Sequence, residues 1–511
     1  MNVPLTPLAF LERARRLFPA RVGVVDGEQR FTYAEYAARC DRLAWALTRE
    51  IGVRPGDRVA WLCGNTHELL EAYYGVLLAG AVLLPLNIRL ATAETRVVLD
   101  DAGASVLFRH LAQADPSDAD ASRAVRSDAV PQVVLGDDYE RLLAAQPDEP
   151  FPVPDVDEDA AAELFYTSGS TGVPKGALLS HRGLYLHAVH NALTGRLTGD
   201  DVVLHTIPLF HVNGWGTPHY VTALGGVHVL LPRFDAAEVL RLVEAERVTR
   251  LFVVPTMMRA LLDEPSLATR DLSSLVQVSI GGAPSGPDLV AEVEQVLGCE
   301  CICGYGMTES SPTLTRSLDK PGEPRSLARR ATTGLPILGV DVRVVDDDDH
   351  EVPRDGATVG EIVARSNHVM IGYWNRPEET ADALRGGWLR TGDLAVVDAD
   401  GYLTIVDRKK DVIVSGGENV SSVEVEKCIA AHPAVREVAV IGVHDERWGE
   451  VPRAFVALKD GVEVTDTELI DFVRARLAHF KAPKSIVFVD ELPKGGTGKI
   501  QKDALRRAGT D

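Results

Sequence analysis

A donor-rich stretch of eleven residues, YTSGSTGVPKG from Tyr166 to Gly176, carries the strongest chemical signal in the sequence. It combines three glycines and four Ser or Thr residues with Lys175, and it follows an apolar segment, AAELF, that we expect to form a buried strand. Backbone amides, hydroxyls and an ammonium group are the donors that bind a polyphosphate. The stretch differs from the P-loop of nucleoside triphosphatases because Pro174 stands where that motif has its second glycine. The alternative is a flexible linker rich in glycine and serine.

Three more glycine-containing segments follow predicted strands: PLFHVNGWG at 208–216, SIGGAP at 279–284 and GYGMTES at 304–310. Ligands of α/β sheets bind at the carboxyl ends of the strands, where such turns lie. Oxygen atoms of Thr308 and Glu309 suit a magnesium ion beside phosphates. The aromatic and glycine neighbours of His211 indicate a pocket wall. A structural histidine, and a tryptophan at 215 that only packs, are the alternatives.

Polar segments also occur near the C-terminus: WLRTGDL at 388–394, DRKKDVIVSGGENV at 407–420 and PKGGTGKIQK at 493–502. Asp393 follows a glycine at a predicted strand–turn junction, where its carboxylate can accept two hydrogen bonds from a ribose diol. Arg408 can reach the same sugar or a phosphate. An N-capping aspartate and a surface arginine are the alternative. Lys499 lies in a glycine-rich loop, where a lysine is usually solvated. In a chain that binds a nucleotide, however, such a lysine is a candidate functional residue.

Alternating helical and strand patterns supply the framework that must position these segments. Residues 31–52 place apolar side chains at helical spacing and end at Gly52, which predicts a helix. Residues 73–86 form the longest apolar run, which we interpret as a buried helix that passes into a strand. Residues 111–160 are rich in Ala, Asp and Pro, so we expect an exposed connection there.

The pattern then changes twice along the chain. The α/β pattern returns from 161 to about 330, and short β patterns separated by turns follow from Gly334. A small separate domain begins near 411. The sequence therefore predicts an α/β protein with two α/β subdomains and a β-rich subdomain in a large N-terminal domain, followed by a small, mobile α+β domain.

The composition excludes several functions. Lys and Arg total 53 against 74 for Asp and Glu, a formal charge of −21, so the chain lacks the basic surface that nucleic acids and anionic lipids require. The longest apolar run is shorter than the roughly 20 residues of a membrane span. Six cysteines are too few for a disulfide scaffold. Cys299, Cys301 and Cys303 alternate as in a core strand and lack zinc spacing. We expect a cytoplasmic protein with reduced thiols.

Taken in order from Thr167 to Lys499, these motifs resemble those of the adenylate-forming superfamily, which includes acyl-CoA synthetases, adenylation domains of peptide synthetases and luciferases. The resemblance covers nearly the whole chain. It implies an AMP-binding domain at 1–407, a hinge at 408–410 that includes Lys410, and a small C-terminal domain at 411–511 that carries a catalytic lysine.

The resemblance also implies roles for individual residues. Lys499, His211, Glu309 and Thr308 are the expected catalytic residues, Thr167 and Glu309 the expected magnesium partners, and Gly416 and Gly417 the expected lining of a tunnel for coenzyme A. His211, Asn213, Trp215, Thr217, Gly282 and Gly306 are expected to line the acyl pocket. The expected ATP-binding residues are Thr167, Ser168, Gly169, Ser170, Thr171, Gly172, Lys175, Gly282, Ala283, Gly304, Tyr305, Gly306, Thr308, Asp393, Arg408, Lys410 and Lys499.

The activity implied is that of an ATP-dependent acid–thiol ligase that uses Mg²⁺, forms an acyl-adenylate with release of pyrophosphate, and transfers the acyl group to coenzyme A. A ligase that loads a free acyl carrier protein, and a natural-product ligase for an unusual acid or a non-carboxylate nucleophile, are the alternatives. The presence of Lys499 disfavours a nucleotide sensor without turnover. An oligomer is compatible with the sequence.

The segment HVNGW resembles the branch of the superfamily that takes hydrophobic acids. It lacks the acidic partner that an amino acid needs and a second cation for a dicarboxylate. Gly281, Gly282, Gly304 and Gly306 are expected to leave room at the floor of the pocket. Val414 and Asn419 stand where some fatty-acyl relatives carry Lys and Trp, which disfavours ordinary long-chain fatty acids. We therefore expect a medium-to-long-chain, aryl or polycyclic monocarboxylic acid.

Overall fold

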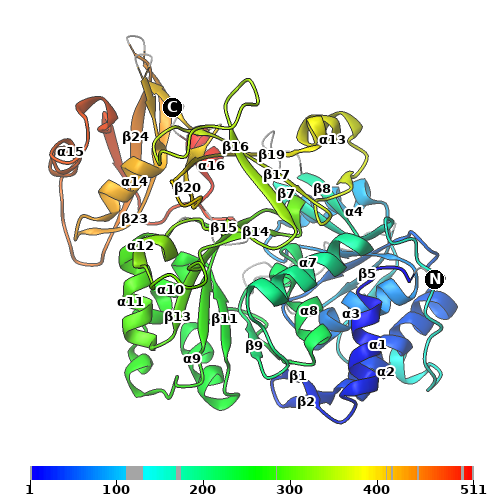
Figure 1. Cartoon of the computed structure of the whole chain (residues 1–511). Helices are drawn as coiled ribbons and strands as arrows, with labels where there is room; N and C mark the ends of the chain where they lie inside the picture. Colours follow the sequence, from blue (N-terminus) through cyan, green and yellow to red (C-terminus); the bar gives the residue numbers. More distant parts are fainter. Residues whose placement is uncertain are drawn as a thin grey trace. The chain divides into compact units, whose positions relative to one another are not determined.

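The computed structural model describes residues 3–110, 130–168, 174–283, 285–409, 411–415, 418–445, 448–495 and 500–508 (Figure 1). The chain forms two compact units. The first comprises Met1–Asp341 with Ala364–Leu389, and the second comprises Val342–Val363 with Arg390–Asp511. The two compact units do not have the boundaries of the predicted domains, 1–407 and 411–511, and they do not show whether the small domain rotates. The predicted hinge at residues 408–410 therefore stays a prediction.

A nine-stranded sheet forms one half of the first unit. Its six central strands run parallel, and antiparallel strands close both edges. Segments such as RLFV and QVSI are buried along their whole length, as is typical of parallel strands covered on both faces. In spatial order the strands are β15 (Leu335–Pro336), β14 (Thr313–Arg316), β13 (Glu300–Gly306), β12 (Gln277–Ile280), β11 (Arg250–Val253), β9 (Val202–His205), β10 (Val227–Leu230), β1 (Val22–Asp26) and β2 (Gln29–Thr32).

A seven-stranded sheet forms the other half. Val59, Trp61 and Phe108 point to one face and belong to the core that also runs through the nine-stranded sheet, whereas Ala60 and Leu107 point to the other face and pack against α4. This alternation follows from the two-residue period of a strand. In spatial order the strands are β18 (Gly372–Tyr373), β8 (Pro174–Ser180), β7 (Ala161–Ser168), β4 (Val82–Pro85), β3 (Arg58–Leu62), β5 (Ala104–Arg109) and β6 (Gln132–Val134).

Helices cover both sheets, and α7 and α8 lie side by side (Figure 1). The first long helix illustrates the local signals: Thr32 and Glu35 form a capping box at its start, and Gly52 ends it with φ of 82°. The helices of this unit are α1 (Leu8–Leu17), α2 (Tyr33–Trp45) continued by η1 (Ala46–Ile51), α3 (His67–Leu78), α4 (Thr92–Ala102), α6 (Asp137–Ala144), α7 (His181–Thr194), α8 (Val212–Leu224), α9 (Ala236–Ala245), α10 (Pro255–Leu262), η2 (Pro265–Thr269), α11 (Pro287–Leu297), η3 (Thr308–Ser310), α12 (Leu327–Arg330), α13 (Pro377–Ala383) and η4 (Arg385–Gly387).

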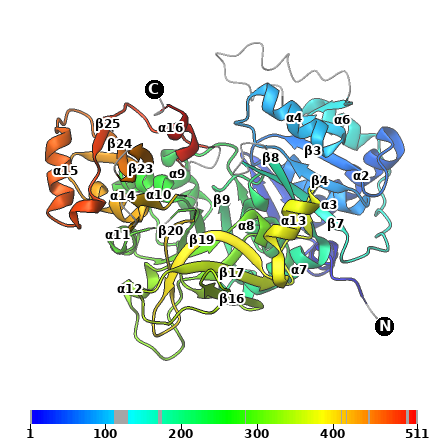
Figure 2. The same cartoon turned by 90° about the horizontal axis from the view of Figure 1, so that it is seen from above.

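The second unit contains two smaller sheets. In the first, β16 (Val340–Val345), β17 (Gly360–Ser366), β19 (Leu389–Val397) and β20 (Leu403–Arg408) lie side by side (Figure 2). The second sheet and its helices surround a separate core that includes Ile413, Val440 and Leu469. Its elements are β21 (Ile413–Ser415), β22 (Glu418–Val420), α14 (Ser422–Ala430), β23 (Val435–Asp445), β24 (Gly449–Leu458), α15 (Asp466–Arg474), η5 (His479–Lys481), β25 (Ser485–Phe488) and α16 (Lys502–Ala508).

The α/β class is confirmed, as are the helix over 31–52, the helix-to-strand passage over 73–86 and the core strand with its buried, free cysteines. One expectation is wrong for the part of the connection that the structure describes. Residues 130–145 contribute β6 and α6, and Tyr139 is fully buried against Trp61 and Phe108. The aspartates of α6 stay exposed, so the polar composition concealed a short helix that contacts the core through Tyr139, Leu142 and Leu143.

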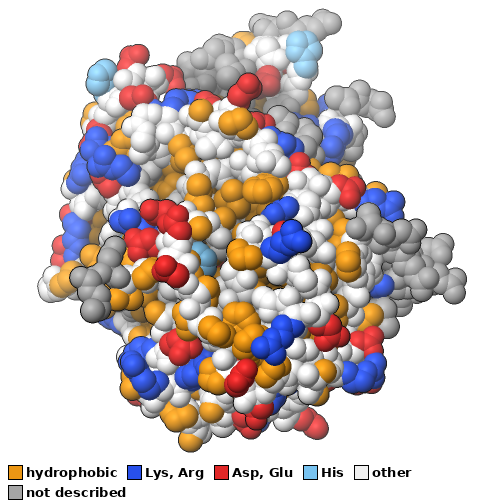
Figure 3. Space-filling view, turned by 90° about the vertical axis from the view of Figure 1, so that its right-hand side faces the viewer, with side chains coloured by type: hydrophobic (Ala, Val, Ile, Leu, Met, Phe, Trp, Pro, Cys, Tyr) orange, Lys and Arg blue, Asp and Glu red, His pale blue; other side chains and the backbone are white. Residues whose placement is uncertain are grey.

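No helix among the described residues is long and apolar enough to cross a membrane. On the face shown in Figure 3, Lys and Arg side chains are interspersed with Asp and Glu among the coloured atoms, so neither sign forms a continuous field there.

Buried histidines predict acid sensitivity of the first unit. Burial lowers the pKa of His205 to about 3 and the pKa values of His181 and His368 to about 4, with the charge of a neighbouring histidine adding to the effect at the last two. An unfolded histidine has a pKa of about 6.5, so the unfolded chain binds protons first as the pH falls. By the time the pH reaches the folded pKa, the cost in stability is about 3 kcal/mol for His181 and for His368 and about 4 kcal/mol for His205.

We therefore expect a melting temperature that is steady above pH 6.5 and falls between about pH 6.5 and 4, measured by differential scanning fluorimetry. The variant His205→Gln should show a shallower fall than the wild type. A melting temperature that does not change between pH 7 and 5 would contradict the expectation.

Candidate active site

Thr167 and Lys175 are paired across the hairpin of β7 and β8. The Thr167 hydroxyl donates to the backbone carbonyl of Lys175 at 3.4 Å. Ser168 pairs with Pro174 at the last described position of the hairpin. Gly169, Ser170, Thr171 and Gly172 lie outside the described residues, and so their predicted role is not examined by the structure. The register nevertheless brings the predicted magnesium partner and the predicted phosphate-binding lysine to the same end of the hairpin.

Tyr373 joins Lys175 to Glu309. The Lys175 ammonium nitrogen lies 5.4 Å from the centre of the Tyr373 ring, and the Tyr373 hydroxyl donates to Glu309 Oε1 at 2.7 Å. Burial, the negative charge of Glu309 and this hydrogen bond all raise the pKa of Tyr373, so the hydroxyl stays a donor. Sequence reasoning missed Tyr373. The only local signal was a pair of aromatic residues after Gly372 in GYWNRP.

The turn that carries Thr308 and Glu309 is fixed on two sides. Both residues are buried in η3, directly after β13. The Glu309 carbonyl accepts from the Met370 amide at 2.8 Å, and the Ser310 carbonyl lies 2.9 Å from His368 Nδ1. A carboxylate offers about four lone-pair sites, so Glu309 can accept from Tyr373 and also coordinate a magnesium ion. The residues present therefore fit that ion.

Glycines shape the ends of β12 and β13, which are parallel neighbours. Gly282 has φ of 82°, in the left-handed region that favours glycine. A Cβ atom on Gly306 would lie within 2 Å of the Pro312 carbonyl oxygen (1.9 Å), so only glycine fits there. The predicted nucleotide-wall residues thus lie together on two adjacent strand ends: Gly282, Ala283, Gly304, Tyr305 and Gly306.

The start of α8 has a left-handed backbone. His211 precedes it as the N-cap residue, and the next residues have φ values between 36° and 86°. This conformation is unfavourable for L-residues, above all for a β-branched valine, and such strain is concentrated at functional sites. The turn comprises Val212, Asn213, Gly214, Trp215 and Gly216.

The left-handed turn places the Trp215 indole over the end of β12. A Cβ atom on Gly281 would lie 2.8 Å from Trp215 Cη2, and the indole meets the Phe252 ring edge-on with centroids 6.4 Å apart. The room that we expected Gly281 to leave in the pocket floor is therefore filled by Trp215. The expectation of open space at this glycine is wrong, because the sequence could not show which side chain covers it.

Two other predicted acyl-pocket side chains, those of Asn213 and Thr217, contact interior partners. Asn213 Nδ2 donates to Glu163 Oε2 at 2.9 Å, and Glu163 Oε1 lies 2.7 Å from His219 Nε2. Thr217 Oγ1 lies 3.1 Å from His205 Nδ1. Glu163, Asn213 and His219 are fully buried. These contacts fasten the left-handed turn to β7 and β9, so they hold Trp215 in place.

Asp393 and Arg408 are paired across β19 and β20 in the second unit. Arg408 Nε lies 3.3 Å from Asp393 Oδ1, and the Arg408 side chain is about half exposed (53%). The predicted ribose-binding pair is thus brought together. Lys410, Gly416, Gly417 and Lys499 lie outside the described residues, and so do the side chains of Val414 and Asn419.

Asp407 is a residue that sequence reasoning did not single out. Its buried carboxylate accepts from the Ser422 amide and hydroxyl at 2.5 and 3.0 Å and from the Arg408 amide at 2.7 Å. The Ser421 hydroxyl donates to the Val406 carbonyl at 2.5 Å. These bonds tie the end of β20 to the start of α14. The signal available in the sequence was its position directly before Arg408.

Comparison with known proteins gives one consistent result. Residues 11–374 match the AMP-binding enzyme family and residues 424–499 match the AMP-binding enzyme C-terminal domain. The chain is 42% identical over 496 residues to a feruloyl-CoA synthase of an Amycolatopsis species, covering 97% of each chain. Among solved structures, it is similar to ATP-bound MatB from Rhodopseudomonas palustris (TM-score 0.89, 31% identity, 100% and 99% coverage). It is also similar to the anthranilate CoA ligase AuaEII with anthranoyl-AMP (TM-score 0.89, 28% identity, 99% and 98% coverage).

Proposed function

Because the chain belongs to the AMP-binding enzyme family, we propose that it joins a hydrophobic, ring-bearing carboxylic acid to coenzyme A. The reaction class, without the identity of the acid, is that of an AMP-forming acyl-CoA ligase, which uses ATP and Mg²⁺ and takes coenzyme A as the acceptor. The carboxylate oxygen attacks the α-phosphorus of ATP and pyrophosphate leaves. The thiol of coenzyme A then attacks the acyl carbon, loses its proton and displaces AMP.

The observation that carries the choice of acid is the Trp215 indole over Gly281. We propose that this indole forms a flat apolar wall of the acyl pocket, supported by the Phe252 ring, which it meets edge-on. A planar ring can stack on such a wall over its whole face, whereas a flexible chain would lose rotamer freedom for a smaller contact. The 42% identical relative is named for feruloyl-CoA, whose acyl group carries a ring.

Charge explains the other proposed roles. The acid and ATP are both anions, so they need cations between them. A magnesium ion supplies positive charge beside the phosphates when it is bound, and Thr167 and Glu309 are the proposed residues that hold it. Lys175 is proposed to bind phosphate oxygens, and Lys499 is proposed to bridge the acid and the α-phosphate. Tyr373 orients Glu309 through its hydrogen bond.

Acid-dependent pyrophosphate release tests the proposal when it is measured over benzoic, cinnamic, ferulic, octanoic, palmitic and malonic acids, with and without coenzyme A. We expect the highest kcat/KM with a ring-bearing acid and formation of its CoA thioester. Preference for palmitic or malonic acid would contradict the proposed acid. Pyrophosphate release without a CoA thioester would identify a ligase for a carrier protein, and no release with any acid would indicate a sensor.

Trp215→Ala is expected to shift acid preference toward larger or longer acids. Removing the indole opens the space over Gly281, and hydrophobic pockets discriminate by about 1–3 kcal/mol per methylene. The measurement is the ratio of kcat/KM for octanoic and ferulic acids in variant and wild type. Phe252→Leu, which keeps the indole, should change this ratio less. An unchanged ranking together with a lower melting temperature would mean that Trp215 only packs.

Tyr373→Phe is expected to lower kcat/KM about tenfold and to raise the Mg²⁺ concentration needed for half-maximal rate. The change removes the hydrogen bond to Glu309, which is worth about 1.5–3 kcal/mol for a charged acceptor, and keeps the ring under Lys175. Pyrophosphate release across a Mg²⁺ titration is the readout. If Tyr373→Phe has wild-type Mg²⁺ dependence, Tyr373 does not position Glu309.

A further inference from the structure

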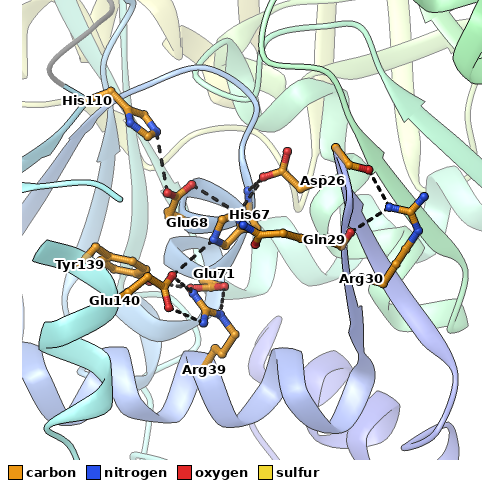
Figure 4. Close-up of polar contacts among 11 residues, drawn as sticks. Asp26, Gln29, Arg30, Arg39, His67, Glu68, Glu71, His110, Tyr139 and Glu140 are labelled. Atoms are coloured by element: carbon orange, nitrogen blue, oxygen red, sulfur yellow. Dashed lines mark hydrogen bonds and ion pairs between the residues drawn. The ribbon is translucent and has the colours of Figure 1, made fainter. Parts of the chain in front are cut away.

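Ionisable side chains from several elements of the first unit meet in one cluster (Figure 4). Asp26 ends β1, His67 and Glu68 begin α3, and His110 directly follows β5. The proposed ligase reaction uses none of them. Behind them lie Arg39 of α2, Glu71 of α3, and Tyr139 and Glu140 of α6.

Three donor atoms converge at the edge of this cluster. His67 Nδ1 lies 2.7 Å from Asp26 Oδ2 and 3.6 Å from Glu68 Oε2, and one donor from each residue lies within 4.8 Å of the others. Asp26 also accepts from the His67 amide at 2.9 Å, so the end of β1 is fixed to the first turn of α3. The donors are therefore held by the backbone of two elements.

The Glu68 carboxylate has a buried oxygen atom that makes no hydrogen bond. The residue is only 4% exposed, and its Oε2 atom has no hydrogen-bond partner. Its Oε1 atom lies 3.8 Å from His110 Nε2, which is also buried without a hydrogen-bond partner. Buried carboxylate and imidazole atoms almost always have a partner, since leaving them without one is costly.

The charges of the cluster do not balance. Arg39 pairs with Glu71 at 2.5 Å and with Glu140 at 2.6 Å, so its single positive charge is already shared by two carboxylates. Asp26 and Glu68 add two more negative charges. The cluster thus attracts positive charge.

We propose that Asp26, His67 and Glu68 bind a zinc ion, with His110 beside it as a second imidazole. Zinc in proteins is bound by imidazole nitrogens and carboxylate oxygens at about 2.0–2.2 Å, whereas magnesium prefers a shell made of oxygen atoms only. The observed separations bring the three donors around one ion after small side-chain shifts. The N-terminus of α3 carries a partial positive charge and favours anions, so it does not attract the zinc ion. The negative charges of the carboxylates provide that attraction.

The ion would join the two sheets of the first unit. Asp26 belongs to the nine-stranded sheet, whereas α3 connects β3 to β4 of the seven-stranded sheet. Its effect is structural and separate from the magnesium ion that Glu309 is proposed to hold. Failure of this proposal would leave the ligase function untouched, because no step of the ligase reaction uses these residues.

The test uses the full-length, tag-free protein without nucleotide, stripped with chelator and titrated with Zn²⁺ in a calorimeter. We expect one tight site per chain and a zinc-dependent rise in melting temperature. Asp26→Asn and Glu68→Gln should each weaken binding about a hundredfold or more. Glu309→Gln should bind zinc like the wild type. Glu246→Gln, which removes an ion pair with Arg30 on neighbouring β2, is the matched control and should also bind normally.

Crystals of the wild type grown with equimolar Zn²⁺ provide a readout that does not depend on the folding of a variant. An anomalous peak between Asp26, His67 and Glu68 at the zinc edge is the expected result. No peak there, a peak only at Glu309 or on the surface, or equal zinc affinity in all variants would overturn the proposal.

Discussion

Replacing Lys499 by alanine is expected to lower acid-dependent pyrophosphate release by about a thousandfold or more. The attacking carboxylate and ATP are both anions, and a single well-placed donor to developing charge is worth about 2.7–4 kcal/mol. A full positive charge that touches both reactants should contribute at least that much. The measurement is single-turnover formation of acyl-adenylate with a ring-bearing acid.

Two comparisons separate this role from a general loss of structure. Lys494→Ala removes another lysine of the same PKGGTGK segment, but Lys494 forms an ion pair with Glu437 at 2.7 Å, so we expect it to retain adenylation. Lys499→Ala supplied with pre-made acyl-adenylate should still form the CoA thioester, since that step no longer needs the lysine. Normal adenylation by Lys499→Ala would remove Lys499 from the first step.

Helices and strands with a periodic pattern of apolar residues could be predicted from the sequence. Contacts between residues that are far apart in the chain could not. The helix over 31–52 and the strand of alternating cysteines follow from local patterns, and both are confirmed. Residues 130–145 were missed because α6 is short and buries only Tyr139 and Leu143, with Leu142 partly buried beside them. At eight residues the helix offers only about two turns of apolar pattern, and it lies in a stretch whose Ala, Asp and Pro content predicts an exposed connection.

The candidate site shows the same limit. The family resemblance predicted that Thr308, Glu309 and Lys175 act in one site. Tyr373, which links Lys175 to Glu309, lies 64 residues from Glu309 and belongs to a short edge strand, so no local pattern pointed to it. The left-handed turn at Val212 was also hidden. Glycines at 214 and 216 suggested a turn, yet a valine with φ of 36° is held there only by long-range contacts such as the bond from Asn213 to Glu163.

Gly417→Leu is expected to leave the first step of the reaction near normal and to reduce thioester formation about a hundredfold or more. A pantetheine arm is narrow and must pass close to the backbone, and only a residue without a side chain leaves room for it. We propose that the small domain rotates about residues 408–410 between the steps and brings Gly417 to this path. Acid-dependent ATP–pyrophosphate exchange and thioester formation are measured on the same preparation.

The bonds of Asp407 define what such a rotation must change. The Asp407 carboxylate accepts hydrogen bonds from the Ser422 amide and hydroxyl, and the Ser421 hydroxyl donates to the Val406 carbonyl. These bonds join residues on either side of the proposed hinge. A rotation of the small domain that starts at Arg408 therefore has to break them. Gly417→Ala, with a much smaller side chain, should be intermediate in the second step. Equal loss of both steps in Gly417→Leu would indicate misfolding or a small domain that does not rotate. Retention of both steps would remove Gly417 from the path of the thiol, and coenzyme A would then have to reach the adenylate without passing this glycine.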